Sequence, residues 1–367
     1  MKLKKTMLVV LCCVLAVGLL AACGTTSPNQ PAQPPSTPPT QTPTDSTPVD
    51  EGPLAGIENE AAVTLRWAEV NPEDSLMGNT ANAFKDAIEE LSKGSVKVEV
   101  YASAVLGKDE STVMETMTSG SSTIDMARIS LMTLENYDQI KLGRLASVPF
   151  IFTGREHFWR VAESDVGKEI MDEPNKVGLG IRGVCFVEEG FRHFFTKREL
   201  TGIESMSGLK LRVSTSPTYV GIVEGVGASA TVVAFGELYS ALDTGVCDGA
   251  EQPIVNYYAN KFHEVAPYMI LDSHTLGAGM ILITNASWDK LGEKQKLAFE
   301  MAAQTASQYN RNASEQAEND AIAALTAEGA NFVQVPNLQP WRDACAGIIG
   351  EITAGMESYV AKIAALE

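Results

Sequence analysis

Cysteine and histidine are scarce in this chain, and their spacing excludes several kinds of site. The 367 residues include six cysteines and four histidines. Cys12 and Cys13 lie in an apolar N-terminal segment, and no CxxC pair or zinc-ligand spacing is present. Cys185, Cys247 and Cys345 are an odd number at wide spacing, so we expect buried free thiols, with a Cys185–Cys247 bridge as the minor alternative. Neither a metal site nor a cofactor is expected.

Motifs of the common hydrolases and nucleotide-binding enzymes are also missing. The chain contains no GxSxG, HExxH or Walker sequence. Residues 178–183 spell GxGxxG, but a dinucleotide site needs a strand before this motif and a helix after it. Here a helix is expected before the motif and a strand after it, so we interpret the match as chance. We expect no enzyme activity, and a surface hydrolase is a distant alternative.

Basic residues are outnumbered, because 28 lysines and arginines stand against 46 aspartates and glutamates, a formal net charge of −18. Three of the lysines lie within the first five residues, so the rest of the chain is more acidic still. Such a surface repels phosphate backbones and anionic headgroups, and nucleic acid is therefore not an expected partner. An anionic ligand would need cationic side chains close to it.

The N-terminal segment has the layout of a secretory signal, with a basic start and an apolar run over residues 7–22 that is too short to span a bilayer. The run ends in Leu20-Ala21-Ala22-Cys23-Gly24, which resembles a bacterial lipobox. Residues 1–22 are thus expected to be a lipoprotein signal peptide whose cleavage leaves Cys23 acylated. An ordinary signal cleaved near Cys23 is the alternative. We expect a protein on the extracytoplasmic, periplasmic side of the bacterial cell membrane, which it touches only through the lipid anchor.

Residues 23–62 comprise the lipidated cysteine and a segment rich in proline and threonine, including SPNQPAQPPSTPPTQTPTDSTP. Such a composition cannot bury enough apolar surface to fold, so we predict a disordered linker that lifts the folded domain off the lipid surface. A structured N-terminal domain is the alternative, but the segment lacks apolar periodicity.

Strands and helices alternate along the remaining residues. Alternating β-branched and aromatic residues predict strands at 63–70, 95–101 and 123–130, and helical spacing of apolar residues predicts helices at 79–94 and 110–119. This βαβαβ order favours a mostly parallel sheet with helices on both faces. Further strands are expected in GIRGVCFVEE, LKLRV, ATVVAF, HEVAPYMIL and GAGMILITN.

Glycine and proline are both absent from residues 293–328. At 1.5 Å per residue this segment allows a helix of about 50 Å, longer than one lobe needs, so we expect it to run across two lobes. Two shorter helices with a polar break near Asn310-Arg311-Asn312 are the alternative.

Residues 190–253 contain four motifs in order: GFRHF, LKLRV, FGELYSAL and TGVCDGAEQP. Together with GSSTIDMARIS and LASVPFIFTGREHFWRV upstream, they resemble the substrate-binding subunits of tripartite ATP-independent periplasmic (TRAP) transporters, which include binders of C4-dicarboxylates and sialic acid. The resemblance covers nearly all of residues 63–360. It implies an α/β, two-lobed periplasmic-binding-protein-like fold with a long helix spanning both lobes, and it implies that FRHF forms a turn.

The resemblance also implies how the chain is divided and what it does. Lobe I is expected to comprise residues 63–189 plus 277–317, and lobe II residues 190–276 plus 318–367. Members of this family deliver a small organic acid to a separate membrane permease, so a TRAP permease is the expected partner of a monomeric binding protein. A sensory ligand-binding protein of the same fold is an alternative.

Two arginines are expected to bind the ligand. In most members of the family, the arginine in the position of Arg212 forms a bidentate pair with the ligand carboxylate, for which a guanidinium fork is suited. Its apolar strand LKLRV agrees with this role, because an unpaired charge is costly to bury, although an outward-facing arginine is possible on pattern alone. The resemblance places Arg192 near the ligand as well, while an ion pair with Glu188 or Glu189 is its alternative role.

The DGAEQP segment departs from the family pattern, in which an asparagine amide binds the ligand at the position of Gln252. DGAE and SPTYV are similar to the branch that binds sugar acids, so we expect a sugar acid or related carboxylate, with a C4-dicarboxylate as the alternative. His274 is expected to be a satisfied loop histidine. Further candidates for ligand contact, each equally compatible with a wall or core position, are Glu69, Asn71, Ser130, Phe150, Ser214, Phe235 and Glu237.

Overall fold

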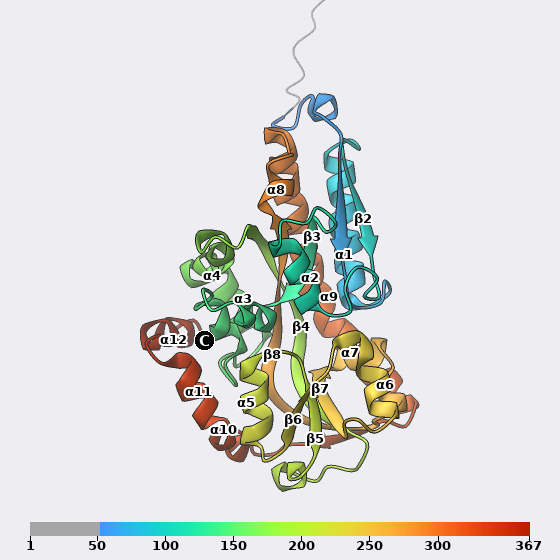
Figure 1. Ribbon diagram of the computed structural model, residues 1–367, viewed down its shortest axis with the longest axis vertical. Coiled ribbons are helices and arrows are strands. Elements are labelled where there is room, and N and C mark those ends of the chain that lie inside the picture. Colours follow the sequence, from blue (N-terminus) through green and yellow to red (C-terminus); the bar gives the residue numbers. More distant parts are fainter. Residues whose placement is uncertain (1–51) are drawn as a thin grey trace, which may run out of the picture. The chain divides into compact units, whose positions relative to one another are not determined.

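A nine-stranded β-sheet runs through the part of the chain that the computed structural model describes, residues 52–367 (Figure 1). The strand order is β2-β1-β3-β8-β4-β7-β5-β6, and β9 pairs with β8. The strands are β1 (Val63–Ala68), β2 (Val96–Tyr101), β3 (Met126–Ser130), β4 (Ile181–Thr196), β5 (Lys210–Val213), β6 (Ser229–Val232), β7 (Gly249–Pro253), β8 (Tyr268–Thr284) and β9 (Asn331–Gln334). The predicted signal peptide, Cys23 and the linker up to residue 51 lie outside the described residues.

The sheet is mixed, whereas a mostly parallel sheet was expected. Both flanks follow the expectation, because β2, β1 and β3 pair in parallel, as do β7, β5 and β6. The centre differs, since β3, β8, β4 and β7 pair antiparallel to one another. Two long strands, β4 and β8, thereby connect two parallel flanks, each built from βα units.

The two central strands correct two expectations. The segments HEVAPYMIL and GAGMILITN were expected to be separate strands, but the YMIL of the first and nearly all of the second lie in the one strand β8, which pairs with β4 along most of its length. The expected FRHF turn lies inside β4, and EQP lies inside β7. Register shifts between Arg192 and Phe194 absorb the extra residues of β8 around Ser273, whose φ is 48°. Long-range pairing therefore overrides the local appearance of a turn.

Helices cover the sheet on both sides. The helix α1 begins three residues before the expected Asn79, because the Ser75 hydroxyl accepts a hydrogen bond from Gly78 N at 3.0 Å and caps the first turn. The helices are α1 (Leu76–Leu91), α2 (Glu110–Thr118), α3 (Arg155–Glu163), α4 (Asp165–Lys176), α5 (Pro217–Gly225), α6 (Leu238–Asp243), α7 (Ile254–Ala259), α8 (Asn285–Trp288), α9 (Glu293–Ala327), α10 (Gln339–Ala344), α11 (Ala346–Thr353) and α12 (Glu357–Ala364).

The helix α9 is continuous over 35 residues, which confirms one long helix rather than two short ones. Its N-terminal half contributes Phe299 to a core that also contains Trp67 and Phe84, and its C-terminal half contributes Leu325 to a different core around Phe195. At Asn310, where a break was possible, the buried amide bonds to both Glu188 N (2.7 Å) and Glu188 O (3.0 Å). The asparagine therefore fastens the helix to β4 instead of interrupting it.

The folded part begins before residue 63, where the expected linker ends. Ile57 lies in a 3-10 helix (Ile57–Asn59) and is fully buried in the same core as Leu65 and Phe299. The Glu60 carboxylate accepts hydrogen bonds from Lys294 N (3.3 Å) and Gln295 N (3.1 Å), where the N-terminus of α9 favours negative charge. Among the described residues, no helix combines the length and apolar character needed to cross a membrane.

Candidate functional site

A cavity of about 320 Å³ opens where strands from both parallel flanks end. The first flank contributes Asn71 after β1 and Ser130 at the end of β3, while the second contributes Arg212 of β5, Phe235 after β6 and Gln252 of β7. Ligands in open α/β sheets bind outside the carboxyl ends of the strands, and this cavity occupies such a position. Its volume suits a small organic molecule.

Eight of the ten residues predicted to contact a ligand line this cavity. They come from segments far apart in the sequence, which the sheet brings to one place. They are Asn71, Ser130, Arg192, Arg212, Ser214, Phe235, Glu237 and Gln252.

The structure places the other two, Glu69 and Phe150, outside the lining. Glu69 lies behind it, where its Oε1 accepts hydrogen bonds from Asn71 N (2.9 Å), Asn71 Nδ2 (3.0 Å) and Arg128 Nη2 (3.3 Å). Phe150 belongs to the core that contains Leu211 and Tyr219, and its N donates to His274 O at 2.8 Å. Glu69 thus positions residues of the lining, and Phe150 supports it from the core.

Among the described residues that line this cavity, Arg212 is the buried cation without an ion pair; Lys108, which also lines it without an ion pair, is exposed. The Arg212 side chain is 2% exposed and is not in an ion pair with any described residue. Nε donates to Val233 O at 2.8 Å, and the guanidinium lies 5.9 Å from the ring centroid of Phe235. Burial lowers the pKa of Arg212 to about 10, so the group remains charged at neutral pH. A buried unpaired cation favours an anion in the space that it faces.

Arg192, the second arginine, is already paired inside the protein. Its Nε and Nη2 donate to Glu251 Oε2 (2.5 Å) and Oε1 (3.0 Å), so the expected alternative partners, Glu188 and Glu189, are not its partners. Its guanidinium also lies 5.1 Å from the ring centroid of Tyr219. One face of Arg192 lines the cavity, but its charge is largely compensated by Glu251.

His274 continues this chain of charges away from the cavity. A loop position was expected, but His274 lies within β8. Its Nδ1 lies 2.7 Å from Asp272 Oδ2, whereas Nε2, 3.6 Å from Glu251 Oε2, makes no hydrogen bond with a described residue, so one of its two ring nitrogens is satisfied. Burial disfavours the charged imidazole, but the two carboxylates outweigh burial and raise the pKa of His274 to about 9. A protonated His274 therefore helps to hold Glu251 against Arg192.

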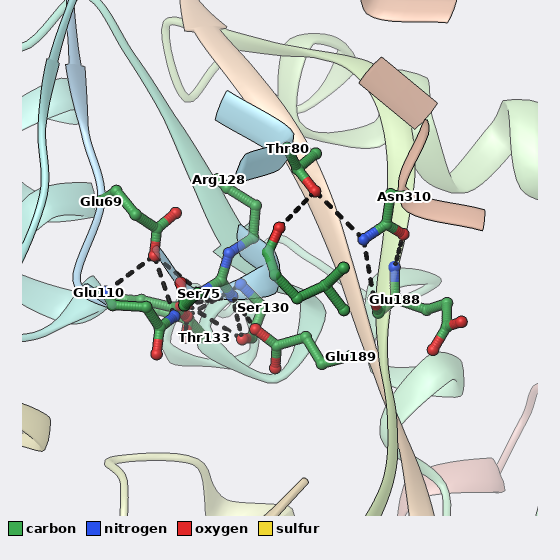
Figure 2. A network of polar contacts seen from close by, with 12 residues as sticks. Glu69, Ser75, Thr80, Glu110, Arg128, Ser130, Thr133, Glu188, Glu189 and Asn310 are labelled. Carbon is green, nitrogen blue, oxygen red and sulfur yellow. Dashed lines mark hydrogen bonds and ion pairs between the residues drawn. The ribbon is translucent and has the colours of Figure 1, made fainter. Parts of the chain in front are cut away.

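Sequence reasoning missed a third buried arginine, Arg128 of β3, which also lines the cavity. Figure 2 shows it surrounded by Glu69, Glu110 and Glu189, with N···O distances of 3.3, 2.6 and 3.1 Å. An arginine within the apolar strand of TIDMARIS is a signal like the apolar strand LKLRV, which agreed with the role expected of Arg212. The carboxylates could not be assigned to Arg128, because they come from the residue after β1, from α2 and from β4.

Two other expectations are met in the described residues. Cys185, Cys247 and Cys345 are buried free thiols, so no Cys185–Cys247 bridge forms. The GxGxxG segment follows α4 and precedes β4, the reverse of a dinucleotide-binding order. Within residues 52–367 there is no cluster of three or more histidine, cysteine or acidic side chains arranged to hold a metal ion.

Comparison with known proteins agrees with this geometry. A family model described as bacterial extracellular solute-binding protein, family 7, matches residues 67–355. The sialic acid-binding periplasmic protein SiaP of Vibrio cholerae is 29% identical over 307 residues, covering 83% of this chain and 94% of SiaP.

Solved structures include two similar TRAP periplasmic solute-binding proteins. One, from Polaromonas sp. JS666 with bound D-erythronate, is 28% identical with a TM-score of 0.77 and covers 83% of this chain and 98% of its own. The other, from Roseobacter denitrificans with bound L-galactonate, is 26% identical with a TM-score of 0.77 and covers 83% and 99%.

Proposed function

Because the chain belongs to family 7 of the bacterial extracellular solute-binding proteins, the binding subunits of TRAP transporters, we propose that it captures a small organic acid in this cavity and delivers it to a TRAP permease. The family binds solutes rather than transforming them, so we propose no catalytic role. Binding to the permease is the step that distinguishes transport from sensing.

One observation carries the proposal: Arg212 is buried, charged and unpaired in the cavity wall. Since Nε is engaged by Val233 O, the two terminal nitrogens remain available for a carboxylate. Two parallel N–H···O bonds would neutralise the charge and fix the orientation of the ligand. An organic anion would supply the negative charge that Arg212 lacks in this part of the cavity wall.

The second feature concerns the rest of the ligand, which we propose is a sugar acid or related hydroxylated monocarboxylate. Ser130, Ser214 and the Gln252 amide suit neutral polar groups, and Asn71 offers a further amide. A C4-dicarboxylate, the alternative, would need a second buried cation, but Arg192 and Arg128 are already paired with carboxylates, and Lys108 is exposed. The sugar acids bound in the two solved relatives support the same choice.

Capture requires closure of two lobes around the ligand. We propose that lobe I comprises residues 63–189 plus 277–317 and lobe II residues 190–276 plus 318–367, so that Arg212 and Ser130 contact the ligand from opposite lobes. A ligand can favour closure only by contacting both. At the mouth of the cavity, Gly236 N donates to Lys108 O at 2.9 Å, and the Ser111 and Thr215 hydroxyls are 2.8 Å apart. These bonds join the same two lobes.

Location follows from the N-terminal segment. We propose that residues 1–22 are removed as a signal peptide, that Cys23 carries lipid and that the residues from Cys23 up to residue 51 tether the domain at the extracytoplasmic face of the cell membrane. The protein would work as a monomer beside its permease.

Binding is tested with a thermal-shift screen followed by calorimetry, using uronates, aldonates, keto acids, amino acids and C4-dicarboxylates. A tight ligand at 100 times its Kd should stabilise the fold by about 2.7 kcal/mol. We expect a hydroxylated monocarboxylate to give the largest shift. A strong shift with succinate, beside no response to any uronate or aldonate, would replace the sugar acid with a dicarboxylate. No response to any acid would refute organic-acid binding.

A further inference from the structure

The cluster around Arg128 contains more negative than positive charge. Three carboxylates, from Glu69, Glu110 and Glu189, surround one guanidinium, and the side chains of Arg128, Glu69 and Glu189 are at most 3% exposed (Figure 2). An excess of buried negative charge is costly unless hydrogen-bond donors compensate it. The hydrogen-bond partners of each carboxylate oxygen therefore show which of these oxygens is free to accept a hydrogen bond from a ligand.

Glu110 is satisfied entirely by the protein. Its Oε1 accepts from Arg128 Nη1 (2.6 Å) and Ser130 Oγ (3.1 Å), and its Oε2 accepts from Ser130 N (2.9 Å) and Thr133 Oγ1 (2.7 Å). Glu69 Oε1 holds Asn71 and Arg128, and its buried Oε2 has no hydrogen-bond partner among the described residues, but Glu69 does not line the cavity. Neither carboxylate offers the ligand a free acceptor oxygen at the cavity surface.

Glu189 differs from both. It lines the cavity, and its Oε1 lies 3.1 Å from Arg128 Nη1 without the alignment of a hydrogen bond. Among the described residues, none donates a hydrogen bond to either of its carboxylate oxygens. Burial raises the pKa of Glu189, with Glu110 and Glu69 adding to the effect while Arg128 and Arg192 oppose it. A buried, unsatisfied acceptor therefore faces the same cavity as the unpaired Arg212.

The neighbouring Glu188 shows that this arrangement is particular to position 189. Glu188 projects to the other side of β4, where it bonds with Arg155 and Ser314 and its backbone is held by Asn310 (Figure 2). Side chains alternate across a strand, so adjacent glutamates serve opposite faces. One of them belongs to the interior and the other to the cavity.

We propose that Glu189 determines ligand specificity: it accepts a hydrogen bond from a hydroxyl group of the ligand and rejects a second ligand carboxylate. This inference rests on the proposed function, because it assumes that Arg212 holds the first carboxylate. A hydroxyl supplies the donor that Glu189 lacks, and a bond to a charged acceptor is stronger than one to a neutral acceptor. A ligand carboxylate at the same place would be repelled by the charge of Glu189, and its own oxygens would have no hydrogen-bond donor. Such repulsion separates the two classes of ligand more strongly than the loss of one hydrogen bond would.

The test is the ratio of two dissociation constants, for succinate and for L-galactonate, measured by calorimetry in the wild type and in Glu189→Gln. The amide keeps the shape of the side chain, removes the charge and leaves one neutral acceptor. We expect the Kd for L-galactonate to rise about three- to thirtyfold and the Kd for succinate to fall, so that the preference for L-galactonate shrinks at least about tenfold.

Two further variants make the test decisive. Glu115→Gln removes one negative charge from the exposed side of α2, and its ratio should equal that of the wild type. Glu189→Asp retains the charge and should weaken L-galactonate binding without any gain for succinate. A ratio within about twofold of wild type in folded Glu189→Gln, an equal change in Glu115→Gln, or a gain for succinate in Glu189→Asp would each overturn the inference. A wild type that binds no acid would overturn the proposed function itself and this inference with it.

Discussion

Replacing Arg212 is the perturbation that probes the site most directly. The guanidinium makes one described hydrogen bond with the protein, from Nε to Val233 O, so two terminal nitrogens remain for the ligand. Two charge-assisted bonds in a buried position correspond to about 3 to 5 kcal/mol of binding free energy. Arg212→Ala should therefore raise the Kd by about 10² to 10⁴-fold. Arg212→Lys keeps the charge but loses the fork, and we expect a loss of about 2 kcal/mol, or about thirtyfold.

The unliganded protein should respond differently from the complex. Because Arg212 has no ion pair to lose, Arg212→Ala should change the unfolding free energy of the ligand-free protein little, while the stabilisation by ligand disappears. Calorimetry gives the Kd, and urea unfolding with and without ligand separates the two effects. Arg311→Ala serves as control, since this arginine pairs with Glu156 and Glu163 on the outer surface. An unchanged Kd in folded Arg212→Ala would remove Arg212 from the binding site.

Three further predictions concern anchoring, pH and the long helix. Cys23→Ser should shift the protein from the detergent phase to the aqueous phase in detergent partitioning and leave ligand affinity unchanged; identical partitioning would contradict lipidation. Because the pKa of His274 is raised to about 9, its stabilising effect is complete below pH 6.5 and is lost as the pH rises through 9. The difference in unfolding free energy between wild type and His274→Gln should thus shrink over that range, and a constant difference in urea titrations would refute it. Asn310→Ala removes both hydrogen bonds that this buried amide makes with the backbone N and O of Glu188, so urea unfolding should show a loss of about 2 to 4 kcal/mol, and a loss below about 0.5 kcal/mol would contradict this role.

Local pattern predicted much of the fold wherever the determining interactions lie close in sequence. The βαβαβ segment from β1 to β3 follows from strand alternation and helical spacing, and helix α9 follows from the absence of glycine and proline. The centre of the sheet could not be derived in this way. Whether β8 is one strand or two depends on its pairing with β4, and the residues of β4 lie far from those of β8 in the sequence. A register shift in this pairing accommodates the irregular backbone of β8 at Ser273.

The candidate site shows the same division. Arg212 was predicted as a ligand contact from the family resemblance, with which its apolar strand agrees, and it does line the cavity, while its role in binding stays a prediction. Which carboxylate serves which arginine was beyond reach, since Glu251 and Arg192 meet only when β7 pairs with β4. The type of a residue and its position in a strand can predict that it needs a partner, but only the tertiary structure shows which residue is that partner. For the same reason, the sequence did not predict that Glu189 lines the cavity.

The burial of the three thiols has a consequence for their reactivity in an oxidising compartment. Burial raises the pKa of Cys185 and Cys345 to about 12 and raises that of Cys247, so almost no thiolate is present at neutral pH. Thiolate is the species that reacts with oxidants and attacks disulfides, and these cysteines are therefore inert in an oxidising compartment. The described domain reaches its native state without forming a disulfide, so its maturation needs no catalyst of thiol oxidation. Protection comes from the fold alone, and any mispairing of these cysteines must happen before folding is complete.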